Sequence, residues 1–533
     1  MRKAYSILAI LLAVAVAVML SGCNSATTSL NQGTNGNNQI QTPPASTVPV
    51  SLTITDDPPA GVSVLFFQVS LTAASLQPTS GSAVSLLPNG TPIQIDVTQL
   101  QALSAFLSTA NVPAGSYSSL SLTFADPQLV IFNTSDQSIA GTCAVGSVCV
   151  LTPAIDNSAS VSLSSTPFPV TVAPNSPLGF LIDYHLNTII QPDLSVNLNA
   201  ANGVSVTQLQ PPSAPPGPPQ FGTLIGSVGT VNPSQSQFTL NTPDGRSFTI
   251  DTSSSTAYDD FPASACSAAS FTCIAQSEIV QVQVSSMGTG GDLLAAQITY
   301  TQAPGQQTVL GTIVGIPPLP LPTGETMIQL ILHQNPTAST SLPLGAMAMV
   351  AVWVQGTAGH IATTFSIDAN GFTIPSGYTF ASPNDLCVGQ TVQVTIAPGT
   401  LQPPKTVTPA ATAGWGLPLE PIFTASSLQL EPSQITGTIS GLGSSSFTLN
   451  SFPNIFLGPW SANATSNNGQ LMVETTSQTT YQGFSPDNFS GLADKDLVSV
   501  NGWVFSQNGL LDPAVGPPNV VAQTITLHPS AVY

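Results

Sequence analysis

Charged side chains are scarce in this chain, which limits the partners it can bind. Of its 533 residues only 5 % are Asp, Glu, Lys or Arg, against about 25 % in a typical soluble protein. The basic residues are Arg2, Lys3, Arg246, Lys405 and Lys495. Phosphate groups are bound by clustered cations, so nucleic acid and anionic lipid surfaces are excluded as main partners. The acidic excess, a formal net charge of −19, is spread too thinly to steer a ligand over long distances.

The short motifs that mark common enzyme classes are also absent. The sequence has no Gly-x-Ser-x-Gly nucleophile elbow, no phosphate-binding Gly-Lys-Ser/Thr loop and no dinucleotide-binding glycine pattern. Neither histidines nor cysteines have the spacing of a zinc site. Each histidine lies in or beside a strand-like run and is predicted to be structural: His185, His333, His360 and His528. The sequence therefore predicts no enzyme, no catalytic residue, no metal site and no cofactor.

Paired carboxylates are the remaining candidates for acid–base chemistry. They are Asp56-Asp57, Asp259-Asp260, and Asp494 with Asp496. Neighbouring residues on a strand point to opposite faces, so no adjacent pair forms a two-carboxylate cleft by itself. Solvated turn residues are the favoured interpretation, and a calcium site near Asp56-Asp57 is an alternative. An enzyme with carboxylates contributed from separate loops also stays open.

The N-terminus carries the pattern of an export signal. An apolar run, Ile7–Leu20, follows two basic residues and is too short to span a bilayer stably. It ends at Leu20-Ser21-Gly22-Cys23, and this arrangement resembles a bacterial lipoprotein signal. The resemblance implies that residues 1–22 are removed and that acylated Cys23 anchors the protein to a membrane, facing away from the cytoplasm. An ordinary secretory signal that happens to end near a cysteine is the alternative. Asn24 after the cysteine favours the outer membrane over the inner membrane.

Four further cysteines form two close pairs in loops of small residues. Cys143 and Cys149 make one pair, and Cys266 and Cys273 make the other. Outside the cytoplasm such pairs oxidise, so two local disulfides are predicted, with buried free thiols as the alternative. Cys387 is left over and is expected to pack as a small hydrophobic residue.

The composition predicts an all-β fold. Val, Ile, Thr, Ser and Gly are abundant, whereas the helix formers Glu, Lys and Arg are scarce. Residues 23–47 are polar and predict a flexible tether. Residues 48–207 hold short runs of alternating apolar residues, which predict a β-sandwich-like domain. One short helix is expected after Asp96, because apolar residues recur every three positions at Val97, Leu100, Leu103 and Phe106.

Two motifs in this domain resemble a bacterial family that is catalogued as domain of unknown function 4382. They are the strand Leu52-Thr53-Ile54-Thr55-Asp56 and the turn Val112-Pro113-Ala114-Gly115-Ser116-Tyr117. In that family the opening strand ends in Thr-Asp-Ala-Pro, and here Asp57 stands in place of the alanine. The resemblance covers about residues 48–205. It implies a β-rich domain outside the cytoplasm and implies no chemistry.

A proline-rich linker at residues 208–220 precedes an internal repeat. The copies are predicted at 221–303, 306–431 and 435–529, and the middle copy is divergent. They open on Gly222–Gly226, Gly311–Gly315 and Gly437–Gly441, and the first and third share a Phe-Thr-Leu strand at 238–240 and 447–449. The pattern resembles domain of unknown function 5666. This resemblance implies three small β-barrels of the oligonucleotide/oligosaccharide-binding (OB) type.

These observations favour a lipid-anchored protein of the cell envelope that binds or spaces other envelope components without catalysing a reaction. The expected partners are the membrane, through the lipid, and a neutral oligosaccharide or an envelope protein. Core or rim packing is favoured over sugar stacking for Trp353, Trp415, Trp460 and Trp503, because they share no position in the repeat. The alternatives are a glycan-active envelope enzyme and an adhesin-like protein that presents a neutral surface.

Overall fold

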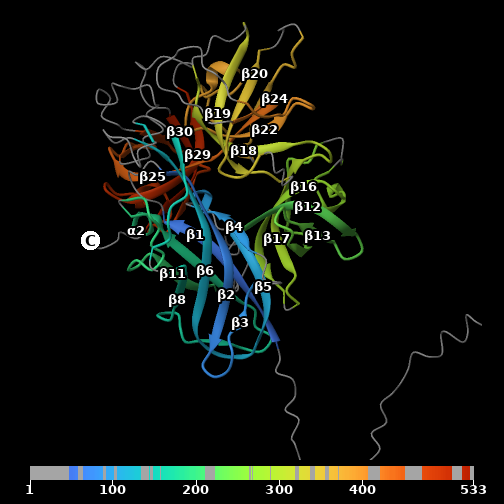
Figure 1. The fold of residues 1–533 in the computed structure, drawn as a ribbon. Helices are drawn as coiled ribbons and strands as arrows, with labels where there is room; N and C mark the ends of the chain where they lie inside the picture. Colours follow the sequence, from blue (N-terminus) through green and yellow to red (C-terminus); the bar gives the residue numbers. More distant parts are fainter. Residues whose placement is uncertain are drawn as a thin grey trace, which may run out of the picture. The chain divides into compact units, whose positions relative to one another are not determined.

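The computed structural model places most of the chain beyond residue 46 (Figure 1). It describes residues 47–57, 64–87, 92–100, 105–133, 143–144, 148–156, 158–191, 193–209, 222–262, 266, 268–288, 290–317, 323–336, 342–354, 359–369, 371–405, 420–450, 471–506 and 519–528. Ser46–Tyr533 forms one compact unit. Within the described residues, no helix combines the length and the apolar character needed to cross a membrane. The predicted signal peptide and most of the tether lie outside the described residues.

The all-β prediction is confirmed. Apart from strands, the regular elements in the described part of the chain are single turns. They are α2 (Leu186–Ile189), η2 (Val97–Leu100), η3 (Phe271–Cys273), η4 (Pro383–Asp385) and η6 (Phe489–Gly491). The scarcity of Glu, Lys and Arg explains this balance, because long helices need those residues on their solvent faces.

The N-terminal region contains two sheets. The first uses β1 (Thr47–Asp57), β5 (Ala105–Pro113), β10 (Leu178–His185) and β11 (Val204–Leu209), in the order β11-β10-β1-β5. The second uses β2 (Val64–Pro78), β3 (Val84–Ser85), β4 (Ile93–Asp96), β6 (Gly115–Phe132), β7 (Val148–Leu151), β8 (Ser160–Leu163) and β9 (Val170–Val172). The long strands β2 and β6 run antiparallel, whereas β1 is parallel to β10.

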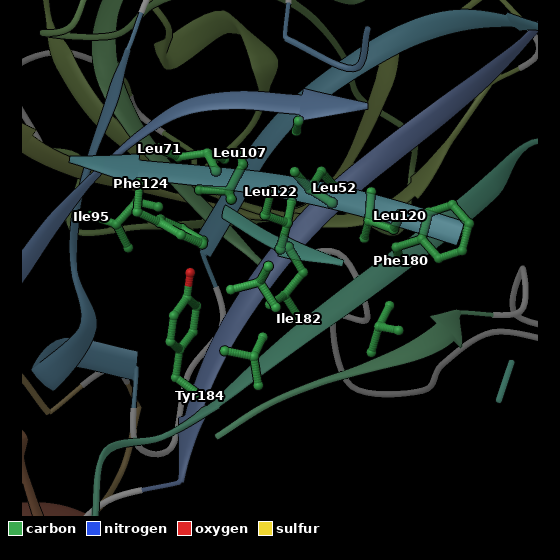
Figure 2. Packing of buried hydrophobic residues seen from close by; sticks show 14 of the residues in the cluster. Leu52, Leu71, Ile95, Leu107, Leu120, Leu122, Phe124, Phe180, Ile182 and Tyr184 are labelled. Carbon is green, nitrogen blue, oxygen red and sulfur yellow. The ribbon is translucent and has the colours of Figure 1, made fainter. Parts of the chain in front are cut away.

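The core of this region lies between the two sheets. Alternate residues of each strand point inward, and Figure 2 shows side chains from both sheets meeting. The first sheet contributes Leu52, Leu107, Phe180, Ile182 and Tyr184, and the second contributes Leu71, Ile95, Leu120, Leu122 and Phe124. All ten are buried. The sandwich-like packing therefore follows from the alternation seen in the sequence.

The helix expected after Asp96 is mostly wrong. Only η2 forms, and the Asp96 carboxylate accepts a hydrogen bond from the Thr98 backbone N–H at 3.1 Å. Phe106, the last expected helical position, lies in β5. Its side chain packs into the core of the next module. Apolar residues three apart fit a helix equally well as a single turn followed by a strand, so the spacing alone could not decide.

The turn motif has a clear local role. It takes a single residue, Ala114, to connect β5 to β6. The Tyr117 hydroxyl donates a 2.8 Å hydrogen bond to the Pro113 carbonyl, and the Tyr117 ring is buried. A tyrosine that satisfies a carbonyl a few residues upstream fixes the direction of the chain at a sheet corner.

Three barrel modules follow. Barrel 1 comprises β12 (Thr223–Asn232), β13 (Gln237–Asn241), β14 (Ser247–Asp251), β15 (Ala257–Asp259), β16 (Ile279–Met287) and β17 (Leu293–Gln302). Barrel 2 comprises β18 (Thr308–Gly315), β19 (Glu325–Gln334), β20 (Met347–Trp353), β21 (Thr364–Ile367), β22 (Thr391–Ile396), β23 (Gln402–Lys405) and β24 (Glu420–Glu431). Barrel 3 comprises β25 (Ser433–Ser440), β26 (Ser446–Asn450), β27 (Leu471–Glu474), β28 (Thr480–Gln482), β29 (Leu497–Phe505) and β30 (Asn519–Leu527).

The same strand pairing closes each module into a ring. The first strand pairs with the second, the second with the third, and the third runs parallel to the last. The last strand also pairs with the fourth ring strand, which is β16, β22 or β29, and this fourth strand pairs with the first. A short strand, β15, β21 or β28, also runs parallel to the last strand of its barrel. Five ring strands with this crossover agree with the predicted OB-like fold.

One glycine is equivalent in the three rings. Gly226, Gly311 and Gly437 each face a valine of the fourth ring strand. A Cβ at these positions would lie 2.4, 2.6 and 2.8 Å from a carbonyl oxygen of the second strand. Only glycine permits this close approach. The sequence alignment of the first opener was therefore wrong by four residues, since Gly226 rather than Gly222 is the counterpart of the other two.

Candidate functional site

The predicted disulfides are present. Cys143 is bonded to Cys149, and Cys266 is bonded to Cys273. Each joins residues six or seven positions apart, so the bonds hold local loops rather than connecting modules. The predicted lipidation site, Cys23, lies outside the described residues.

Cys387 occupies a position that small residues take in the other barrels. Its backbone N–H donates to the Gln390 side chain at 2.8 Å. Ala275 and Ala493 make the same contact with Glu278 and Asp496, three residues further on. Burial raises the pKa of the Cys387 thiol to about 12. A protonated thiol in a structural slot is a poor nucleophile, which agrees with the expected packing role.

Asp494 and Asp496 belong to this same turn. Lys495 between them has a positive φ of 77°, as Ser277 (71°) and Gly389 (94°) have at the equivalent positions. Asp496 uses its carboxylate to accept the Ala493 N–H at 2.8 Å. This geometry supports the interpretation as turn residues. For Asp56 and Asp57 only the backbone in β1 is described.

Two of the described histidines are buried and hydrogen-bonded, and a third stacks on a tryptophan ring. His528 Nε2 lies 2.6 Å from the Ser499 hydroxyl. The His360 ring stacks on Trp353 with centroids 3.5 Å apart. His333 is 3 % exposed and contacts a carboxylate and a hydroxyl. His333 thus lies between a carboxylate and a hydroxyl, the two neighbours that acid–base catalysis would need.

Asp96, His333 and Thr312 are arranged in the order of a catalytic triad. Asp96 Oδ2 lies 2.7 Å from His333 Nδ1, and Thr312 Oγ1 lies 3.0 Å from His333 Nε2. Asp96 is separated from His333 by 237 positions, so sequence reasoning could not find the contact. The Asp96 and His333 side chains are 7 % and 1 % exposed, respectively. The contact joins β4 of the N-terminal region to barrel 2.

The surroundings of Thr312 do not suit a nucleophile. Its strand, β18, pairs with β19 on one side and with β22 on the other. The N–H of the next residue, Ile313, donates to the Gln390 carbonyl at 2.8 Å and is not available for an oxyanion hole. The arrangement therefore favours a clamp between modules over acyl transfer.

A second cluster brings together three carboxyl groups from barrels 1 and 2. Asp260 follows β15, Asp368 follows β21, and Glu431 ends β24. The Asp368 side chain hydrogen-bonds to both of the others. Burial, then the neighbouring Asp368, raises the pKa of Asp260 to about 7, and the same causes raise that of Glu431 well above its usual value. Of this cluster only Asp260 was a candidate from sequence, because the other two lie in distant segments.

The raised pKa values of Asp260 and Glu431 mean that these groups keep a proton over a wider pH range than a free carboxyl group. Among the described residues, no group of three His, Cys, Asp or Glu side chains has the arrangement of a metal site. Asp368 is in hydrogen-bond contact with both of the others and is therefore closer to them than the about 5 Å that the closer of the two glycosidase mechanisms needs, which leaves Asp260 and Glu431 as the pair for such a mechanism. The Trp503 indole donates to the Asp368 carbonyl at 2.8 Å and extends the contact to barrel 3.

The aromatic residues that could stack a sugar are largely interior. Trp353 and Trp503 are 5 % and 0 % exposed, and Trp415 and Trp460 lie outside the described residues. Tyr378 is half-buried, and its hydroxyl donates to Glu474 at 2.6 Å. Burial raises the pKa of Tyr378 to about 12. The placed tryptophans thus pack in the interior.

Comparison with known families matches part of the chain. Residues 47–202 match the family described as Domain of unknown function (DUF4382), which agrees with the resemblance seen in the sequence. No curated protein matches the chain.

Proposed function

We propose that this protein is a lipid-anchored component of the cell envelope that acts as a non-enzymatic spacer or binding module. The observation that carries the proposal is the way the modules of Ser46–Tyr533 are joined by buried contacts. Spacing two components requires a body that keeps its form under load, and contacts buried between modules provide this.

The junctions link each module to another. Arg246 of barrel 1 donates to the Leu107 carbonyl of the N-terminal region. Gln390 of barrel 2 donates to the Val504 carbonyl of barrel 3 at 3.0 Å. The core of barrel 2 also includes Trp503, Phe505 and Val521 from barrel 3.

The membrane anchor rests on Cys23 and the apolar run before it. In this proposal the acylated chain faces away from the cytoplasm and is held at the outer membrane. The two disulfides fit an oxidising compartment. Mass spectrometry of the mature N-terminus should show an acylated Cys23, and Cys23→Ser should move the protein from the membrane to the soluble fraction. An unmodified Cys23 in membrane-extracted material contradicts the anchor.

The three barrels are proposed to be copies of one unit related to domain of unknown function 5666. Their common ring order and the equivalent glycines support this. With few cations, the ligands that remain for such barrels are neutral oligosaccharides or envelope proteins. Glycan arrays and envelope extracts offered to the chain without residues 1–45 test binding. If the protein retains neither a glycan nor an envelope component, spacing without binding is supported.

A glycan-active enzyme is the second candidate, and the carboxyl cluster is the observation that favours it. Asp260, Asp368 and Glu431 come from separate segments, as such an enzyme requires. Turnover of a polysaccharide that Asp260→Asn or Glu431→Gln abolishes would replace the spacer proposal. Equal inactivity of wild type and variants supports the non-enzymatic role.

A further inference from the structure

The outer face of barrel 2 gathers methionines. The chain has seven, and Met327, Met347 and Met349 lie on two paired strands, β19 and β20. Met349 is opposite Gln329, Met327 is opposite Ala351, and Met347 is opposite Ile331. The alternate residues of these strands, such as Leu330 and Val350, fill the barrel core. The three methionines therefore lie on one face of the sheet, with Met349 two positions along the strands from each of Met347 and Met327, which are four positions apart.

A buried carboxyl group joins this face from the third strand. Glu420 begins β24, which runs parallel to β20 with Ile422 opposite Met349, and this places Glu420 beside Met347. Glu420 is 2 % exposed. Its Oε1 accepts a 2.7 Å hydrogen bond from Gln329 Nε2, and the same nitrogen lies 3.6 Å from Met347 Sδ. Its Oε2 has no hydrogen-bond partner.

Packing alone does not account for this carboxyl group. The neighbouring cluster of Met327, Met349, Ala351 and Trp353 is apolar, and burial raises the pKa of Glu420 to about 7. Methionine fills irregular gaps in cores, and so would leucine. A buried oxygen atom without a hydrogen-bond partner requires an explanation, and a bound group next to it is one.

We propose that Met347, Met349 and Glu420 form a binding site for Cu(I), with Met327 as a further thioether. Soft sulfur ligands select Cu(I) among the common metal ions, and one carboxylate neutralises its single charge in a buried place. The Gln329 amide N–H donates toward both the Met347 sulfur and the Glu420 carboxylate. These two acceptors therefore already converge on a positively polarised group, and a bound Cu(I) ion would take its place. Divalent cations that prefer oxygen ligands are disfavoured, because the site offers one carboxylate.

The test is an anaerobic competition for Cu(I) between the purified full-length chain and bicinchoninate. We expect the wild type to withdraw one equivalent of Cu(I). We expect Met347→Leu/Met349→Leu to weaken binding at least tenfold, because leucine keeps the volume and removes the sulfur. Met472→Leu is the matched control, since Met472 is exposed in barrel 3 and should change nothing. Cys387 is present in the wild type and in every variant, so it does not contribute to the differences in Cu(I) affinity between them.

Glu420→Gln separates the metal site from a purely structural cluster. It should weaken Cu(I) binding, because the amide cannot neutralise the charge of the ion. Thermal unfolding of the metal-free variants checks that they fold, and Ag⁺ should raise the midpoint of the wild type more than that of either variant. A wild type that leaves all Cu(I) with bicinchoninate overturns the proposal. A folded Met347→Leu/Met349→Leu variant that binds Cu(I) with wild-type affinity also overturns it. If the double variant fails to fold, wild-type affinity of folded Met349→Leu has the same meaning.

Discussion

Three buried threonines make the same contact in the three barrels. The hydroxyls of Thr256, Thr363 and Thr479 each donate to an alanine carbonyl of the last ring strand at 2.8 Å. Each hydroxyl also accepts a backbone N–H, at 2.9, 3.1 and 2.9 Å. The threonine thus ties the segment after the third strand to the end of the ring, and both of its hydrogen-bonding roles are filled.

Thr479→Val should destabilise the protein by about 1–3 kcal/mol, because it leaves a buried carbonyl and a buried N–H without a partner. Thr479→Ser should retain most of the stability, since it keeps the hydroxyl. Equilibrium denaturation by urea measures both. Thr480→Val, one residue away on an exposed position, is the control. Equal loss in the two valine variants would refute a specific role for the buried hydroxyl.

Cys387 should resist alkylation in the folded protein. Burial raises the pKa of its thiol to about 12, so the reactive thiolate is rare at pH 8. Iodoacetamide followed by mass spectrometry should find Cys387 unmodified in buffer and modified in denaturant. Rapid modification of the folded chain would show that the slot opens.

At the scale of elements, the ends of β15, β21 and β24 meet in the carboxyl cluster. The folded-state pKa of Asp260 is raised from 3.8 to about 7 by burial and by Asp368. A carboxyl with a raised pKa binds its proton more tightly in the folded state, so it stabilises the fold below the unfolded pKa. That contribution is lost as pH rises through about 7.

The urea midpoint should therefore fall as pH rises from about 4 to 8. Asp260→Asn should flatten the dependence, because the amide keeps a neutral group at every pH. Asp494→Asn, in an exposed turn, should leave the slope unchanged. A slope that is the same in Asp260→Asn and wild type would exclude Asp260 from the effect.

Sequence reasoning succeeded where the signal is local. Alternating residues predicted the strands, and short cysteine spacings predicted the disulfides. It failed where one pattern serves two structures, as with Phe106 after Asp96. In the middle barrel the counterpart of Thr256 is Thr363, which follows a longer third-strand loop, so the spacing that relates the other two copies is broken. The contacts of His333, Glu420 and Glu431 join segments far apart and leave no local trace.

At the scale of the whole molecule, barrels 2 and 3 share their cores. Trp503, Phe505 and Val521 of barrel 3 are at most 1 % exposed and pack with barrel 2. Met347 and Ile331 of barrel 2 pack in turn with barrel 3. Each aromatic or aliphatic side chain uncovered by separating them costs about 1.5–3 kcal/mol.

Residues 433–528 alone should therefore fail to unfold cooperatively, whereas residues 306–528 should show one sharp transition. Residues 222–302 provide the comparison, because among the described residues Phe106 is the one fully buried side chain that barrel 1 takes from outside, with Leu209 packed partly buried against it. Calorimetry and binding of a hydrophobic dye distinguish these outcomes. A cooperative transition of 433–528 at the midpoint of the longer fragment would show that the cores are independent.

Ring closure has a consequence for solubility. Soluble β proteins commonly place lysines on exposed strand edges, which keeps these edges from pairing with other molecules. This chain has almost no lysines. In each barrel the pairing of the third strand with the last removes that edge instead. A chain that carries so little charge is thereby kept from pairing with its neighbours by topology rather than by repulsion.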